Sequence, residues 1–184
     1  MLRVKHACSD RVRPAQAPAQ AAAQAPAQAP AQAPAQAPAQ APAQAMHGQC
    51  HCGAIRAELS TAKAAAALQA RSCQCAFCRR HGAITVSDPD GRVLWTIDPR
   101  ALVSYAFATR SGRILLCGKC GVYAGVVLDE GGAAWSVLNV RGLAVPEFLG
   151  RAGEPVCYDG ETAARRRARR KASWTPAEIV YEQR

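Results

Sequence analysis

The fold of this chain is decided by a stretch that carries three thiols in six residues, Cys73-Gln74-Cys75-Ala76-Phe77-Cys78. A cysteine pair stands on each side of it in the sequence, Cys50-His51-Cys52 and Cys117-Gly118-Lys119-Cys120. Cysteines separated by one or two residues bring their sulfurs close enough to share one metal ion, which is how thiolate zinc sites are assembled. The grouping therefore predicts two bound zinc ions.

The two outer pairs together supply four thiolates, the number that closes a tetrahedral zinc site. In a Cys-x-Cys pair on a strand both cysteine side chains leave the same face, so His51 would point away from the metal as a surface residue. The glycines after Cys117 and Cys120 are typical of a zinc-knuckle turn. We assign a structural zinc, which joins the start of the domain to its later hairpins, to Cys50, Cys52, Cys117 and Cys120.

The middle group, Cys73, Cys75 and Cys78, offers only three ligands and leaves one tetrahedral position free. A free position separates a catalytic zinc from a structural one. The alternative is that His81 completes a closed site, in which case both zincs are structural and the protein is a small scaffold. Arg79 and Arg80 follow the triplet, where they would receive a carboxylate substrate or lie solvated on a turn.

A disulfide framework is the rival interpretation of a cysteine-rich chain. The amino-terminal stretch lacks the apolar core of a signal peptide, and no apolar run is long enough to cross a bilayer. We therefore expect a cytoplasmic protein with reduced thiols and no membrane partner. Cysteines so close in sequence also close almost no loop, which makes them poor structural disulfides. Cys8 and Cys157 lack close neighbours and are treated as unassigned thiols.

The chain divides at Met46. Residues 1–45 contain a near-perfect Ala-Gln-Ala-Pro repeat from Pro14 to Ala45, without charge or large apolar side chains, and we expect this tail to be disordered. Residues 46–184 form the predicted zinc-binding domain, with the cysteines lying before about Cys157. Because Met46 directly precedes the first cysteine motif, we also consider that translation starts there.

The domain is predicted to be mostly antiparallel β, because its apolar residues alternate in short stretches rich in β-branched side chains. Breaks are expected at 88–91, 98–99 and 130–132, of which the first and last have hairpin-type turn chemistry. The Ala-rich stretch Thr61–Ala70 has no apolar stripe and is interpreted as a loop with a helical turn. The expected strands are 54–59, 83–87, 93–97, 102–108, 113–116, 122–128 and 134–140.

The net charge of +10 lies mostly outside the predicted core. Residues 46–160 carry 12 Lys and Arg against nine Asp and Glu, which leaves only +3. The stretch Arg165–Lys171 holds six basic residues in seven. It predicts either a solvated basic loop or a patch that binds nucleic-acid phosphates, although no interleaved aromatic residues support base stacking.

Taken together, the motifs resemble the glutathione-dependent formaldehyde-activating enzyme family, whose domain also occurs in centromere protein V. The resemblance covers roughly Met46 to the Trp174 region and leaves the repeat tail outside. It rests on Gly48-Gln49-Cys50-His51-Cys52-Gly53-Ala54-Ile55, on Cys73-Gln74-Cys75-Ala76-Phe77-Cys78-Arg79-Arg80-His81-Gly82-Ala83, on Cys117-Gly118-Lys119-Cys120-Gly121 and on Asn139-Val140-Arg141.

The resemblance implies a β-tent fold, a structural zinc on the outer pairs and a catalytic zinc on Cys73, Cys75 and Cys78. It also implies a carbon–sulfur lyase that adds glutathione to formaldehyde to give S-(hydroxymethyl)glutathione. Arg79, Arg80, Asn139 and Arg141 are the candidate substrate contacts, although Asn139 and Arg141 would equally stabilise a turn at a strand end. The alternative function is a non-catalytic zinc-stabilised binding module, associated with nucleic acid through its basic carboxyl-terminal segment.

Overall fold

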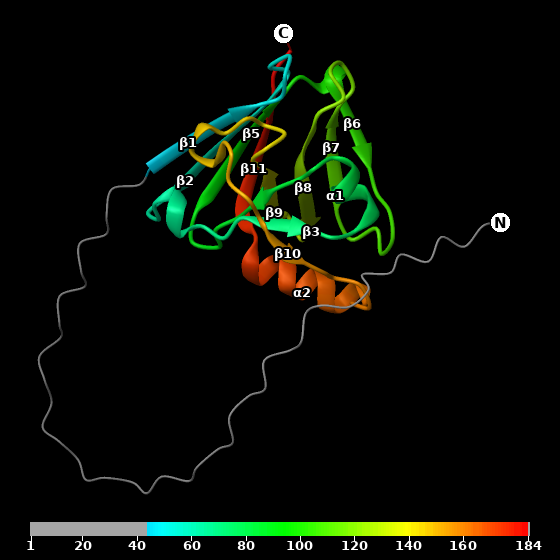
Figure 1. Cartoon of the computed structure of the whole chain (residues 1–184). Helices are drawn as coiled ribbons and strands as arrows, with labels where there is room; N and C mark the ends of the chain where they lie inside the picture. Colours follow the sequence, from blue (N-terminus) through cyan, green and yellow to red (C-terminus); the bar gives the residue numbers. More distant parts are fainter. Residues whose placement is uncertain (1–43, 184) are drawn as a thin grey trace, which may run out of the picture.

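The structure is a computed structural model, and it describes residues 44–183. These residues form one mixed sheet of 11 strands, with few helices (Figure 1), so the predicted mostly β fold is confirmed. The strands are β1 (Gln44–Gln49), β2 (Ile55–Thr61), β3 (Arg71–Cys73), β4 (Thr85–Val86), β5 (Arg92–Ile97), β6 (Leu102–Tyr105), β7 (Arg113–Cys117), β8 (Tyr123–Glu130), β9 (Ala133–Asn139), β10 (Glu154–Val156) and β11 (Thr175–Tyr181).

The sheet has two parts that share the last strand, β11. One part runs β1-β2-β5-β11, and the other carries β9 with its neighbours β8 and β4. Thr175 and Pro176 pair antiparallel with β9, whereas the stretch Ala177–Tyr181 pairs parallel with β5. β10 also pairs parallel with β3, and the other described pairings are antiparallel, so the predicted mostly antiparallel sheet is confirmed with two parallel pairings added. Two parallel neighbours must be joined by a long connection. The alternation of apolar residues within a strand does not show which distant strand it will pair with.

The predicted turns differ in what they connect. Glu130-Gly131-Gly132 closes the antiparallel hairpin of β8 and β9, as expected. The turn at 88–91 was expected to form a hairpin, but it links β4 to β5, and these two strands pair with other strands and not with each other. The break at Asp98-Pro99 opens a short 3-10 helix, η2 (Pro99–Ala101), whose first backbone N–H groups are capped by Asp98.

The core lies between the two parts of the sheet and is built from alternating positions. In β2 every second residue, beginning with Ile55, is buried. The largest fully buried side chain is Trp95 of β5, whose Nε1 donates a hydrogen bond to Ser136 Oγ of β9 at 3.0 Å. This bond joins the two parts of the sheet through their centre, and it satisfies the polar atom of a side chain that is otherwise buried for its apolar area.

The helices were the least predictable elements. The stretch Thr61–Ala70 contains one 3-10 turn, η1 (Ala65–Ala67), in agreement with the expected helical turn. Helix α1 (Ala76–Arg80) carries part of the cysteine triplet, and a further 3-10 turn is η3 (Pro146–Phe148). Helix α2 (Ala163–Ser173) contains the basic stretch, so the expected basic loop there is wrong; it lies beside β3 and β10 in Figure 1.

The strand β1 begins at Gln44, two residues before the predicted boundary at Met46. Met46 itself is buried in the core, opposite Leu59. The rest of the predicted disordered tail lies outside the described residues. None of the helices in residues 44–183 has the length and the apolar character needed to cross a membrane.

Candidate metal centres

The first cysteine pair lies in the turn that joins β1 to β2. The Cys50 N–H donates to Ile55 O at 2.8 Å, and the Ile55 N–H donates to Cys50 Sγ at 3.3 Å. Gly53 has a φ of 73°, a conformation that favours glycine, and this lets the chain reverse directly after Cys52. The expected strand at this pair is therefore wrong: the two sulfurs are brought together by a tight turn. His51 is exposed, as expected for a surface residue.

The second pair lies in the turn between β7 and β8. The Cys117 N–H donates to Val122 O at 2.9 Å, and Gly121, with a φ of 75°, donates to Cys117 O at 2.7 Å. This is the knuckle that the glycines predicted. Lys119, at the tip of the knuckle, forms an ion pair of 2.8 Å with buried Asp98, and this pair, with Arg100, holds the pKa of Asp98 well below its usual range. The knuckle is thereby tied to the end of β5.

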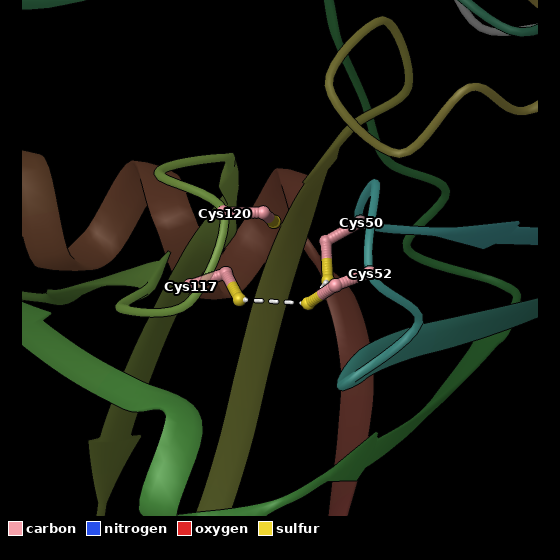
Figure 2. Close-up of side chains that lie close together, drawn as sticks. All are labelled: Cys50, Cys52, Cys117 and Cys120. Carbon is pink, nitrogen blue, oxygen red and sulfur yellow. Dashed lines mark hydrogen bonds between the residues drawn. The ribbon is translucent and has the colours of Figure 1, made fainter.

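The four sulfurs of these turns lie within 4.8 Å of one another and point into the same space (Figure 2). Two of the sulfur–sulfur distances are 3.7 Å, from Cys50 to Cys52, and 3.5 Å, from Cys52 to Cys117. A tetrahedral zinc with sulfur at 2.3 Å requires sulfurs about 3.8 Å apart. The donor set and its spacing therefore fit a closed four-sulfur zinc site.

Burial affects the protonation of these thiols. It raises the pKa of Cys50, and it raises the pKa of Cys117 to about 12. Burial opposes ionisation at Cys120 as well, but hydrogen bonds from the backbone N–H groups of Val122 and Cys52 outweigh it and lower the pKa of Cys120 to about 6. Four thiolates this close together repel one another unless a cation is bound, and a zinc ion would supply that charge.

The cysteine triplet is held by β3 and α1. Cys73 ends β3, which β10 flanks, while Cys75 caps the amino end of α1 by accepting a hydrogen bond from the Cys78 N–H at 3.4 Å. Cys78 lies inside α1 and is buried. The three sulfurs lie within 4.8 Å of one another, so these residues can hold a second metal ion. Among the described residues no His, Asp or Glu joins this group.

His81 is not part of the triplet. Its side chain is exposed at the end of α1, and its ring packs against Phe77 with centroids 4.5 Å apart. The three thiols of the triplet shift the pKa values of one another. Hydrogen bonds from Cys73 and Cys78 lower the pKa of Cys75. The neighbouring Cys73 and Cys75 thiols strongly raise the pKa of Cys78. As in the first cluster, full ionisation requires a bound cation.

The triplet opens into a cavity of about 450 Å³. All three of its cysteines line the cavity, together with aromatic side chains that sequence reasoning missed. Phe77 lies at the centre of this aromatic wall, and its ring centroid is 5.2 to 5.7 Å from those of Tyr105, Phe107 and Tyr123. Only Phe77, which stands inside the cysteine motif, could have been found from the sequence.

The four predicted substrate contacts have different positions. Asn139 is buried and its amide is fully used: Oδ1 accepts from the Ile84 N–H at 3.2 Å, and Nδ2 donates to Tyr123 O at 2.8 Å. Arg141 Nη1 donates to Gly82 O at 3.0 Å, behind α1. Neither residue lines the cavity at the triplet, so these contacts agree with the alternative that Asn139 and Arg141 stabilise a turn at a strand end.

The arginines that follow the triplet are both exposed. Arg80 lines the cavity, and it is the one of this pair that keeps its candidate role. The basic helix α2 adds Arg166, Arg169 and Arg170 to the cavity wall. Sequence analysis did not connect this helix with the cysteines, because its contact with the triplet depends on tertiary packing.

Cys157 belongs to neither cluster and is not among the free thiols. The prediction of an unassigned thiol at Cys157 is therefore wrong. Cys8 lies outside the described residues.

Comparisons with known proteins add one similar structure. Neither the scan against protein-family models nor the search of curated proteins found a match. Among solved structures, a protein from Rhodobacter sphaeroides is 34% identical, over 60% of this chain and 100% of that chain, with a TM-score of 0.44. The chain is therefore similar to a bacterial protein that is described by its organism and not by an activity.

Proposed function

We propose that this chain is a zinc-dependent enzyme of the carbon–sulfur lyase class, which joins glutathione or a related thiol to formaldehyde or another small aldehyde. The observation that carries the proposal is the three-thiol cluster, which has no fourth protein ligand among residues 44–183 and opens into a cavity of about 450 Å³. The named reaction comes from the resemblance of the cysteine motifs to the formaldehyde-activating family.

Cys73, Cys75 and Cys78 would hold the zinc ion. When bound by three thiolates, zinc offers a fourth position to an external thiol and favours its deprotonated form. In the proposed reaction a bond forms between the thiol sulfur and the aldehyde carbon, and the carbon–oxygen π bond breaks. The thiol proton ends on the former carbonyl oxygen, so the product is an S-hydroxymethyl thioether.

The residues of the cavity wall would position the reactants and limit access of water. Phe77 and Tyr123 pack edge to face, with centroids 5.2 Å apart, and Tyr123 is buried next to the cysteines. Tyr105 and Phe107 stack at 5.7 Å and are partly exposed at the rim of the cavity. Aromatic side chains that surround a few polar groups are the usual composition of a small-molecule site. Holding thiol and aldehyde together there would supply much of the acceleration.

The alternative of a nucleic-acid module receives less support from the arrangement of α2. Arg169 is paired with Glu161, Lys171 with Glu130, and Arg170 lies over the Trp174 ring at 4.5 Å. Most of the basic stretch is therefore directed toward other protein groups. A helix that binds phosphates non-specifically would expose these charges along one face.

The experiment that tests the proposal measures the formation of S-(hydroxymethyl)glutathione by exchange NMR spectroscopy, with zinc content determined on the same samples. The zinc-loaded protein is expected to accelerate the condensation of glutathione with formaldehyde. Cys75→Ala is expected to lose the acceleration together with one zinc ion, because two thiolates no longer hold the metal, and to keep the zinc of the four-sulfur site. Equal acceleration by the parent protein and Cys75→Ala would overturn the proposal.

A further inference from the structure

The cavity at the cysteine triplet has a second chemical character besides its sulfurs. Five arginines line it, and they are contributed by three elements that are separate in the sequence. Arg71 comes from β3, Arg80 from α1, and Arg166, Arg169 and Arg170 come from α2. Five guanidinium groups on one small cavity repel each other unless anions compensate their charges.

Two of these arginines are compensated by Glu161. Arg169 binds the Glu161 carboxylate through two hydrogen bonds of 2.7 and 2.9 Å, and its guanidinium carbon lies 3.7 Å from the centre of the Tyr158 ring. Arg166 Nη2 donates to Tyr158 O at 2.6 Å, and its Nε lies 3.3 Å from the same Glu161 carboxylate. The Glu161 carboxylate therefore pairs with both Arg166 and Arg169.

Arg71 and Arg170 are bound differently, because their hydrogen-bond partners are neutral. Arg71 Nη2 donates to Ser87 Oγ, and Arg170 Nη1 donates to Ser111 Oγ at 3.0 Å. The Glu161 carboxylate pairs with Arg166 and Arg169 and not with these two residues. Burial lowers the pKa of Arg170 to about 10, so its guanidinium stays charged at neutral pH.

Arg170 is held firmly in this position. Its guanidinium lies over the Trp174 ring at 4.5 Å, and its Nε is buried without a hydrogen-bond partner. Gly112 makes room for it, because a Cβ atom at that position would lie 2.6 Å from Arg170 Nη1. A partly buried guanidinium loses hydration that a partner must offset, and the nearby Glu161 carboxylate is already paired with Arg166 and Arg169.

We propose that Arg170, together with Arg71, forms a carboxylate-binding subsite in the same cavity as the cysteine triplet, so that the thiol substrate is one that carries a carboxylate. The inference rests on the proposed function for the role of the thiol. The guanidinium groups would receive the carboxylate through charge-assisted hydrogen bonds. The sulfur of the same molecule would reach the triplet, and the substrate would be oriented at both ends.

The test uses two thiols of similar size, 3-mercaptopropionate and 2-mercaptoethanol, which differ in the carboxylate. Isothermal titration calorimetry of the zinc-loaded full chain measures the dissociation constant of each. We expect 3-mercaptopropionate to bind about tenfold more tightly, as one charge-assisted pair would supply. Arg170→Met is expected to abolish this preference, and Arg170→Lys to retain part of it.

Arg165→Met is the matched control, because Arg165 lies on the same helix, is exposed and does not line the cavity. It removes the same charge and should keep the preference. No preference in the parent protein, or equal loss in Arg165→Met and Arg170→Met, would overturn the inference. Because titration measures binding without turnover, a carboxylate preference in a protein that does not accelerate the aldehyde reaction would uphold this inference and refute only the proposed activity.

Discussion

At the scale of single residues, the structure separates side chains that hold the site together from those that face the cavity. Asn139 and Arg170 illustrate the difference. The Asn139 amide makes hydrogen bonds to two backbone groups and has no polar group left for a ligand. Arg170 lies partly buried on the cavity wall with a serine hydroxyl as its hydrogen-bond partner. Of these two polar side chains, only Arg170 is positioned to bind a ligand in the cavity.

Replacing Asn139 tests this distinction. Asn139→Ala would leave Tyr123 O and the Ile84 N–H buried without partners, and an unsatisfied buried group costs about 1–3 kcal/mol of stability. We expect a lower urea midpoint, with binding of 3-mercaptopropionate changed by less than about twofold because no ligand contact is lost.

Arg141→Met serves as the comparison for Asn139→Ala, because Arg141 makes a single exposed hydrogen bond to Gly82 O. It should lower the urea midpoint by less. An Asn139→Ala variant with unchanged unfolding but markedly weaker thiol binding would contradict the structural assignment and restore Asn139 as a substrate contact.

At the scale of elements, the four-sulfur cluster joins the β1–β2 turn to the β7–β8 turn, which belong to different parts of the sheet. The three-sulfur cluster lies within one region, at the end of β3 and in α1. The first site closes a long stretch of chain and its metal is enclosed by protein ligands, whereas the second opens into a cavity. The two zinc ions should therefore differ in both lability and effect on stability.

Metal removal tests this difference. During titration with a chelator, the first zinc released should come from the triplet and change the melting temperature little. Release of the second should unfold the domain, because structural zinc contributes on the order of 10 kcal/mol to folding. Zinc quantification and circular dichroism on the same samples follow both steps.

The variant Cys78→Ser provides the control for this titration. It should contain one zinc ion and melt close to the parent protein. Loss of half of the zinc accompanied by complete unfolding, in the parent or in this variant, would contradict the division into a structural and an open site.

At the scale of the whole molecule, local sequence patterns predicted several of the strands and which cysteines belong to each cluster. The strands β7, β8 and β9 lie within two residues of their expected bounds, because each is a short, mainly apolar run bounded by turn residues. The cluster members were predictable because motif spacing directly constrains sulfur positions.

Other features could not be predicted because they depend on contacts between distant parts of the chain. The strand β11 pairs with both β5 and β9, and neither partner is indicated by its own pattern. Helix α2 has no apolar stripe, and it packs through arginines that lie over Tyr158 and Trp174. Its place on the cavity wall therefore emerges only from the folded chain. The same tertiary packing brings Arg170 into the cavity that the triplet lines.

The central claim is that one zinc has four sulfur ligands and the other three, with the last position available to a substrate. Zinc-edge X-ray absorption spectroscopy of the protein loaded with two zinc ions tests it directly. Seven sulfurs shared by two ions predict an average of about 3.5 sulfurs per zinc, with an oxygen or nitrogen ligand completing the coordination. Addition of 3-mercaptopropionate should raise the average toward four sulfurs. An average of four sulfurs per zinc before the thiol is added, or a spectrum that does not change on its addition, would contradict the account and leave a scaffold with two structural zincs.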